Sequence, residues 1–330
     1  MGELKKEEKT IVTSSETTVR PGINDPRRQT GHLWKRVVKH KYIYLLALPS
    51  VIYFLVFKYA PMWGILLAFQ DYSPFKGFLA SEWVGFKHFE TLFTHDMFWV
   101  LLRNTLGINL VNLIFFFPLP IVLALMLNEI KIEPVKRVIQ SIVYLPHFLS
   151  MVIIVGFTYF FLSTDIGLVN KGLTAMGIEP VSFLTNPNYF WGLLTMQSIW
   201  KEVGWGTIIF LAAIAGVDQQ LYEAAIVDGA GRFRRVWHIT LPAIRSTIVI
   251  LLIMRVGHMM DVGFEQVLLM LNPLVLPVGE VFDTYVYKQG ILSGQTSYSI
   301  AVGLFKSIVG LVLVMLANRL AKKFGEEGLY

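Results

Sequence analysis

Long apolar segments dominate this sequence of 330 residues. A membrane-spanning helix needs about 20 apolar residues, because its rise of about 1.5 Å per residue must cross a hydrocarbon core roughly 30 Å thick. Six windows reach that length: Tyr42 to Phe69, Trp99 to Leu127, Val138 to Leu162, Tyr189 to Gly216, Ala243 to Met270 and Ile300 to Leu320. None of them alternates like a barrel strand, and a backbone in hydrocarbon must satisfy its own hydrogen bonds. The sequence therefore predicts an all-α integral membrane protein with six transmembrane helices.

The composition supports this class and excludes several kinds of site. Charged residues make up only 16% of the chain and the mean hydropathy is +0.56, both far from the values of soluble domains. The absence of cysteine excludes disulfides and thiolate metal sites. No His/Glu cluster has metal-ligand spacing, and no G-x-x-x-x-G-K-S/T loop is present. We expect no metal, cofactor or ATPase site in this chain.

Basic residues are distributed unevenly between alternate connections. The N-terminal tail, the second and fourth connections and the C-terminal tail carry most of the lysines and arginines outside the apolar windows. The opposite face has only Lys76, Lys87, Lys171 and Lys288. Since basic loops stay in the cytoplasm, both termini are predicted to be cytoplasmic. This asymmetry also explains the net charge of +6, so no nucleic-acid partner is expected.

These features divide the sequence into three parts. Residues 1–41 form a polar cytoplasmic tail that ends in a basic interfacial segment, HLWKRVVKHK, and contain no cleavable signal. Residues 42–320 form the transmembrane domain, and residues 321–330 form a short cytoplasmic tail. Within the second window, Pro118 and Pro120 predict a kink, which suits either a transport pathway or simple helix packing.

The fourth connection, residues 221–242, contains the stretch EAAIVDGAGRFRRVWHITLP. At about 100° per residue, one side of a helix through this stretch carries Tyr222, Ala225, Ile226, Gly229 and Phe233. An amphipathic cytoplasmic helix is predicted. Gly229 would cost that helix about 1 kcal/mol relative to Ala, which indicates a close backbone approach or the turn that ends a first short helix.

Two interpretations of this helix are open on physical grounds. It can rest on lipid headgroups, helped by Arg232, Arg234 and Arg235. It can instead dock its apolar face into a groove on a cytoplasmic partner.

The same stretch resembles the EAA loop of permease subunits in ATP-binding-cassette importers. Glu223-Ala224-Ala225, Gly229, Ile239 and Leu241-Pro242 stand at the defining spacing of that motif. The wider stretch WKEVGWGTIIFLAAIAGVDQQLYEAAIVDGAGRFRRVWHITLPAI is similar to the maltose-type carbohydrate permeases. The later stretches DVGFEQVLLMLNP, TYVYKQG and AVGLFKS are similar to the polysaccharide permease branch of that group.

The resemblance implies a type I importer permease fold in which this loop is the coupling helix that docks on the ATPase. The positions it assigns to the coupling contact are Glu223, Ala224, Ala225, Asp228, Gly229, Ala230, Phe233, Ile239, Leu241 and Pro242. One departure concerns the first external connection, Asp71 to Phe98, which lacks the domain inserted there in the larger maltose-type subunit.

The resemblance also implies the setting of the chain. It predicts a multi-pass protein of the bacterial cell membrane, surrounded by lipid and paired with a second, related permease subunit as a heterodimer. Two cytoplasmic ATPase subunits would bind ATP and Mg, and an extracellular solute-binding protein would deliver an oligosaccharide.

Polar residues inside the fourth and fifth windows suggest where the substrate passes. Glu202 and Arg255 fall at similar depths, so they can meet across adjacent helices. Arg255, His258, Val262 and Glu265 follow a spacing that places them on one face of a continuous fifth helix. The candidate pathway residues are Gln197, Trp200, Lys201, Glu202, Trp205, Arg255, His258, Asp261 and Glu265. Such hydrogen-bonding groups beside aromatic faces are typical of sugar sites.

Alternatives remain for these residues. Glu202 and Arg255 can form a purely structural pair, with a histidine that only packs helices. The basic groups Lys201, Arg255 and His258 suit acidic sugars such as uronates, although Glu202, Asp261 and Glu265 offset much of that charge.

We therefore expect a permease subunit of an ATP-driven oligosaccharide importer. One alternative is an ion-coupled secondary transporter that uses the intramembrane charges as relays. Another is a membrane enzyme acting on lipid or polysaccharide, with Asp261 and Glu265 as an acid/base pair.

Overall fold

The computed structural model describes residues 38–323, 325 and 328, so most of the predicted N-terminal tail and interfacial segment lies outside the described residues. The chain separates into two units, Met1–Trp63 and Gly64–Tyr330. In the first unit, helix α2 (Lys41–Phe54) continues through the π-helical turn η1 (Leu55–Tyr59) into the 3₁₀ segment η2 (Ala60–Phe69), which runs into the second unit. No side chain of α2 is buried.

The described residues of the second unit form helices, connecting loops and one small hairpin, in agreement with the predicted all-α class. Strands β1 (Gln70–Asp71) and β2 (Glu82–Trp83) pair antiparallel. The first half of its helices comprises α3 (Gly77–Ala80), α4 (Lys87–Thr94), α5 (Met97–Phe115), α6 (Pro118–Asn128), α7 (Glu133–Tyr144), η3 (Leu145–Phe148), α8 (Met151–Leu162), α9 (Leu168–Ala175) and α10 (Pro187–Ala215). The second half comprises α11 (Gln219–Val227), α12 (Arg232–Arg235), η4 (Val236–Thr240), α13 (Leu241–Ala243), α14 (Arg245–Gly257), α15 (Phe264–Met270), α16 (Leu276–Gly279), α17 (Phe282–Tyr287), η5 (Lys288–Leu292) and α18 (Thr296–Lys323).

Four of the six predicted windows are helical segments long and apolar enough to cross a membrane. These are Lys41–Phe69, Met97–Asn128, Pro187–Ala215 and Thr296–Lys323. The second of them is interrupted between α5 and α6, where Pro118 lies in the first turn of α6. A proline is tolerated there because its missing N–H would have no partner in the first turn of a helix.

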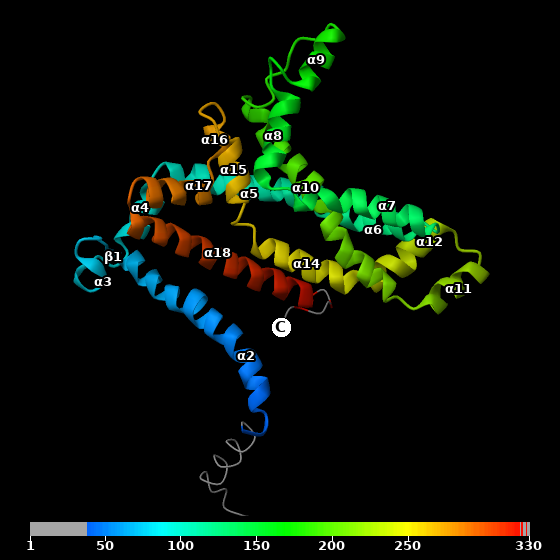
Figure 1. The fold of residues 1–330 in the computed structure, drawn as a ribbon, viewed down its shortest axis with the longest axis horizontal. Helices are drawn as coiled ribbons and strands as arrows, with labels where there is room; N and C mark the ends of the chain where they lie inside the picture. Colours follow the sequence, from blue (N-terminus) through cyan, green and yellow to red (C-terminus); the bar gives the residue numbers. More distant parts are fainter. Residues whose placement is uncertain (1–37, 324, 326–327, 329–330) are drawn as a thin grey trace, which may run out of the picture. The chain divides into compact units, whose positions relative to one another are not determined.

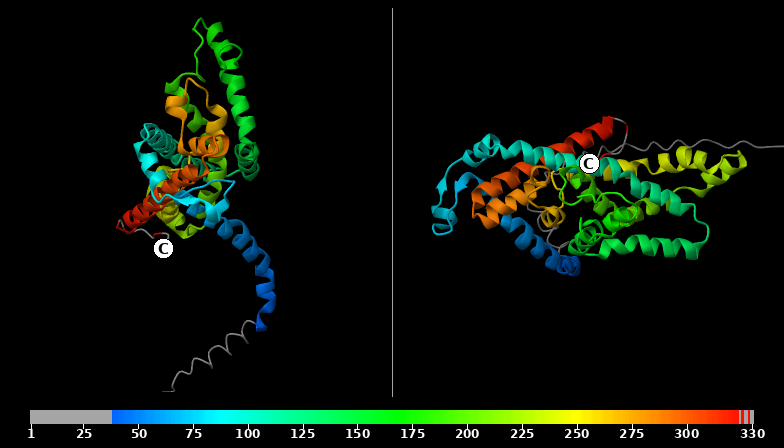
Figure 2. Two further views of the ribbon diagram at one scale, coloured as in Figure 1. Left: turned by 90° about the vertical axis from the view of Figure 1, so that its left-hand side faces the viewer. Right: turned by 90° about the horizontal axis from the view of Figure 1, so that it is seen from above.

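The third window is bent rather than straight. Glu133–Phe148 and Met151–Leu162 meet at 100°. Pro146 has no backbone N–H, so one hydrogen-bond donor is missing just before the bend. Ser150 is the N-cap of α8, and its Oγ accepts a hydrogen bond from the Ile153 N–H. Figure 1 shows α8 and α9 leading away from α7, and the left view of Figure 2 shows the same green segment from the side.

The fifth window is also broken, which contradicts a continuous helix from Ala243 to Met270. Arg232–Ala243 and Arg245–Gly257 meet at 62°, and α14 then ends at Gly257. Helix α15 starts only at Phe264, after Gly263 with a φ of +91°, a conformation that other residues rarely adopt. Counting each bent pair as one span, the described residues contain up to six spans.

Helices α14 and α18 lie side by side in the second unit (Figure 1). A methyl group at Gly257 of α14 would collide with Val314 of α18, and one at Gly310 would lie 3.1 Å from the Gly257 carbonyl oxygen. Small residues are what allow membrane helices to approach so closely. This contact brings the end of α14 next to the polar middle of α18.

Candidate functional site

The predicted coupling loop is two short helices rather than one. Helix α11 starts with Asp218 as N-cap and ends at Val227, and Gly229 follows with a φ of +74°. The Ala230 N–H donates to the Ala225 oxygen at 2.8 Å, which closes the helix end in a Schellman-type turn. No described heavy atom lies within 4 Å of a Cβ placed at Gly229. The turn interpretation of Gly229 is therefore confirmed, and the close-approach interpretation is not supported within this chain.

This turn also corrects the predicted apolar face. Phe233 belongs to α12 and does not share a helix with Tyr222. The Tyr222 hydroxyl lies 2.9 Å from the Thr240 hydroxyl, and Tyr222 packs against the buried cluster that contains Phe210. Phe233 is 84% exposed. The loop is anchored at its base, and its tip presents apolar side chains to the surroundings.

The structure places all ten coupling candidates on this segment. Ile239 and Leu241 pack at its base in the same buried cluster as Tyr222. Those that are exposed are Glu223, Ala224, Asp228, Gly229, Phe233 and Pro242, while Ala225, Ala230, Ile239 and Leu241 are partly buried.

Three candidate pathway residues of α10 gather around His147, a residue that the sequence analysis missed. The His147 Nδ1 lies 2.8 Å from a Glu202 carboxylate oxygen. Its ring stacks on Trp205, with 4.3 Å between centroids and 3° between planes. The Lys201 ammonium donates to the carbonyl oxygens of His147 and Leu149. A histidine within the third apolar window, next to Pro146, was the signal that could have indicated this site.

Glu202 and Arg255 form no ion pair, although the Glu202 carboxylate is near enough to interact electrostatically with the Arg255 guanidinium. Glu202 pairs with His147 and with Lys201, whereas the Arg255 guanidinium lies over the Phe116 ring, 5.3 Å from its centroid. Arg255 has no ion-pair partner among the residues that the structure describes. It lines a cavity of about 250 Å³ whose other walls include Phe116, Phe210 and His258.

Gln197 forms a structural network and also borders the apolar cavity that Trp200 lines. It is buried, its amide nitrogen donates to the Thr158 hydroxyl at 2.8 Å, and its oxygen accepts from Gln266 at 2.9 Å. These bonds join α8, α10 and α15. Trp200 is half-exposed, lies edge-on to Phe157, and lines a separate apolar cavity of about 670 Å³.

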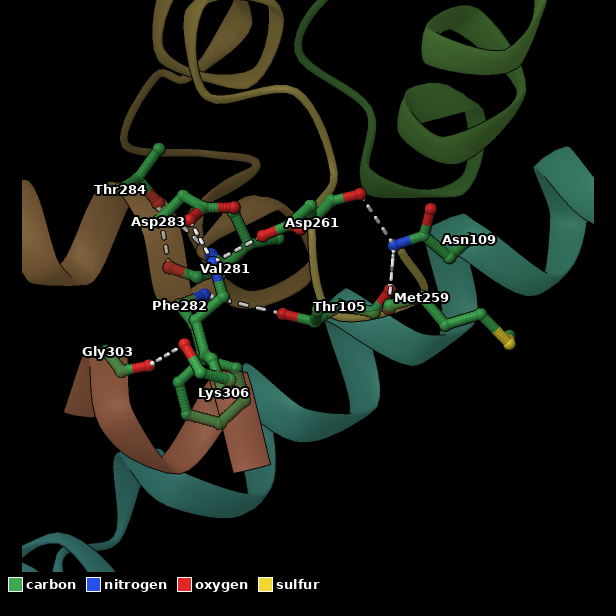
Figure 3. A network of polar contacts seen from close by, with 11 residues as sticks. Thr105, Asn109, Met259, Asp261, Val281, Phe282, Asp283, Thr284, Gly303 and Lys306 are labelled. Atoms are coloured by element: carbon green, nitrogen blue, oxygen red, sulfur yellow. Dashed lines mark hydrogen bonds and ion pairs between the residues drawn. The ribbon is translucent and has the colours of Figure 1, made fainter. Parts of the chain in front are cut away.

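The remaining three candidates lie at or after the end of α14 and do not form one helix face. The His258 Nδ1 contacts the Met254 carbonyl oxygen at 2.8 Å, and Glu265 is exposed. Asp261 is 2.9 Å from the ammonium of Lys306 in α18, which also contacts Asp283 of α17. Figure 3 shows Lys306 between the two carboxylates.

Lys306 and Asp283 are not among the residues predicted from the sequence. Lys306 lies inside the sixth apolar window, where a single charge does not lower the average hydropathy enough to be noticed. Because Asp261 is engaged by Lys306, the arrangement does not support the acid/base pair of Asp261 and Glu265. Among the described residues, no group of three or more His, Cys, Asp or Glu side chains could hold a metal ion.

Comparison with known proteins decides the family. Residues 116–326 match the family described as the binding-protein-dependent transport system inner membrane component. The chain belongs to this family. Its membership confirms the type of fold, a multi-pass membrane location and a role in transport rather than catalysis. It leaves no support for the secondary transporter or the membrane enzyme.

Individual relatives of this permease cover almost its whole length. It is 57% identical over 295 residues to the polygalacturonan/rhamnogalacturonan transport system permease protein YteP of Bacillus subtilis (strain 168), covering 89% of this chain and 92% of the relative. It is 55% identical over 301 residues to Protein LplB of the same organism, covering 91% and 95%.

A solved structure has the same fold. A chain of the bacterial alginate ABC transporter, in complex with an alginate pentasaccharide-bound periplasmic protein, superposes with a TM-score of 0.83 at 40% sequence identity. The match covers 90% of this permease and 99% of that chain.

Proposed function

We propose that this permease belongs to an ATP-driven importer of oligosaccharides that contain uronate. The observation that carries the proposal is its 57% identity, over nearly the whole chain, to a polygalacturonan/rhamnogalacturonan permease. The alginate transporter gives independent support, because alginate is also an acidic polysaccharide. Both relatives are named for polymers rich in carboxylates, so the importer is expected to prefer acidic sugars.

The cluster around His147 has the chemistry to hold a sugar in transit. Trp205 is 46% exposed, so part of its indole surface remains available to the CH face of a sugar ring. Glu202 accepts hydrogen bonds from hydroxyl groups. Arg255, which forms no direct ion pair with the described residues, offers a charge-assisted hydrogen bond to a uronate.

The exposed tip of the loop, residues 221–242, is proposed as the coupling contact with the ATPase. Its apolar side chains, Ile226, Val227 and Phe233, suit a groove on a protein partner better than water. This role requires the loop on the cytoplasmic side, as the distribution of basic residues predicts. We also propose a heterodimer with a second permease, two ATPase subunits that bind ATP and Mg, and an extracellular solute-binding protein.

The bend before α14 offers a way to transmit movement. Helices α12 and α13 join α14 at 62°, and Ile244 at the joint is buried in a cluster with Phe210. A displacement of the loop would therefore move α14, which carries Arg255. ATP favours the closed ATPase dimer, and this preference biases the bundle between its two openings.

Reconstitution tests this function. The permease, its second permease subunit, the ATPases and the binding protein are placed in proteoliposomes with ATP on the ATPase side. Uptake of a galacturonate trisaccharide should require ATP and exceed uptake of its carboxyl-reduced form. Uptake driven by an ion gradient without ATP would overturn the proposed coupling, and equal uptake of the two sugars would overturn the preference for uronate.

A further inference from the structure

Lys306 is a buried cation held between two carboxylates from different parts of the chain. Its side chain is 10% exposed. It contacts Asp283 of α17 and lies 2.9 Å from Asp261, which follows the end of α14. An ammonium that is removed from water needs such partners, because the loss of its hydration is unfavourable.

The surroundings fix the backbone that carries each carboxylate. Asn109 of α5 donates to the carbonyl oxygens of Met259 and Asp261, at 2.9 and 3.2 Å. Thr105 accepts a hydrogen bond from the Phe282 N–H at 3.3 Å, next to Asp283 (Figure 3). The site is therefore preorganised around the position of the Lys306 ammonium.

The two carboxylates differ in how far they are exposed. The Asp283 side chain is 22% exposed, whereas the Asp261 side chain is 61% exposed. Asp261 and Lys306 line a cavity of about 380 Å³ with His258 and Ser307. Asp261 can thus leave Lys306 and regain water, but Asp283 remains largely enclosed.

The cavity also adjoins the one that contains Arg255 on the proposed sugar route. His258 and Met254 line both this cavity and the cavity that contains Arg255. Because the Met254 carbonyl only accepts hydrogen bonds, the His258 Nδ1 must carry a proton. In the neutral ring, Nε2 is then an acceptor for a hydroxyl group.

We propose that Lys306 binds the carboxylate of a uronate unit in transit, and that Asp261 is the internal carboxylate that occupies this site when no sugar is present. The exchange keeps the number of carboxylates paired with Lys306 constant. Lys306 retains Asp283 and replaces Asp261 with the sugar carboxylate, while Asp261 becomes hydrated. This inference rests on the proposed function, and it identifies Lys306 of α18 as a residue that determines the preference for uronate.

The test uses the complete reconstituted transporter and measures half-saturating concentrations for transport of a galacturonate trisaccharide and of its carboxyl-reduced form. Asp261→Asn removes the competing carboxylate and should lower the value for the acidic sugar about tenfold, the size of a charge-assisted hydrogen bond. The value for the reduced sugar should change little. Lys306→Gln should raise the value for the acidic sugar by a similar factor, and Lys306→Arg should restore most of it.

Lys288→Gln is the matched control, because Lys288 pairs with the buried Glu280 and does not line this cavity. It should affect both sugars alike. Should Lys306→Gln fail to assemble, the Asp261→Asn comparison carries the test alone. Equal effects of Asp261→Asn on the two sugars would overturn the role of Lys306. A wild-type transporter that does not prefer the acidic sugar would instead overturn the proposed function.

Discussion

The rings of His147 and Trp205 lie parallel, 4.3 Å apart, and join the bend of the third window to the middle of α10. Glu202 holds the edge of the His147 ring at Nδ1, so the position of the indole depends on a charged residue one turn away in the same helix. This relationship makes Trp205 a fixed aromatic surface.

Trp205→Ala should weaken sugar binding. The loss of one aromatic contact of about 1.5 kcal/mol corresponds to a roughly tenfold rise in the half-saturating concentration. Trp200→Ala is the matched control, because Trp200 is similarly exposed but packs against Phe157 and not against His147. Transport kinetics in proteoliposomes measure both variants, and an equal effect of the two would remove the special role of Trp205.

Gly229→Val should disrupt the coupling loop through the backbone alone. The φ of +74° is unfavourable by about 1–2 kcal/mol for an ordinary L-residue, while no described atom crowds the position. Gly229→Asn tolerates this conformation and should retain function. Copurification of the ATPase subunits with each variant tests the prediction. Normal ATPase binding and transport by Gly229→Val would contradict it.

Asn109→Leu should destabilise the permease. The substitution leaves the carbonyl oxygens of Met259 and Asp261 without this donor, at a cost of about 1–3 kcal/mol. Asn112→Leu offers a contrast, because the Asn112 side-chain oxygen is buried with no hydrogen-bond partner among the described residues. Thermal unfolding of the purified complex should show a lower Tm for Asn109→Leu and little change for Asn112→Leu. A reversed order would refute this account.

The ion pair of Asp71 with Lys87, at 3.0 Å, should make the hairpin of β1 and β2 sensitive to acid. The hydrogen bond from Lys87 lowers the pKa of Asp71 below its usual value of 3.8. Because the pKa of Asp71 is lower in the folded state than in the unfolded state, the ion pair stabilises the fold at pH values above the unfolded-state pKa. This stabilisation is lost as the pH falls through the folded-state pKa.

Both side chains are more than half exposed, so the effect is expected to be small. The Tm difference between wild type and Asp71→Asn should be present at pH 6, begin to shrink near pH 3.8 and vanish at lower pH. Lys87→Gln should abolish the same difference. A Tm difference that stays constant with pH would assign the effect to packing.

The spans and the loop could be predicted because their signals are local. Hydropathy is read from consecutive residues, and the motif from Glu223 to Pro242 is a single stretch of chain. The helix breaks were missed because the averaged hydropathy of the fifth window hides Gly257 and Gly263, which end one helix and start another.

The partners of the charged residues depend on tertiary contacts. Lys306 meets Asp261 from 45 positions away, and His147 meets Glu202 from 55. Counting residues along the helices predicted that Glu202 and Arg255 lie at the same depth in the membrane. The bend near Pro146 instead brings His147 into contact with Glu202. Such pairings follow from the path of the chain between windows, which periodicity does not encode.

The hydrogen bonds of Lys201 to the His147 and Leu149 carbonyl oxygens affect how the charge of the transported sugar can be inferred from the sequence. At the sharp bend these two carbonyl groups use a side-chain ammonium as their donor. The Lys201 ammonium thus donates its hydrogen bonds to the backbone of this chain, whereas Arg255 has no such backbone acceptors among the described residues. A count of all lysines within the spans therefore overstates the positive charge that a transported sugar encounters. When related permeases are compared for the charge of the sugars they transport, this lysine should be left out of the count.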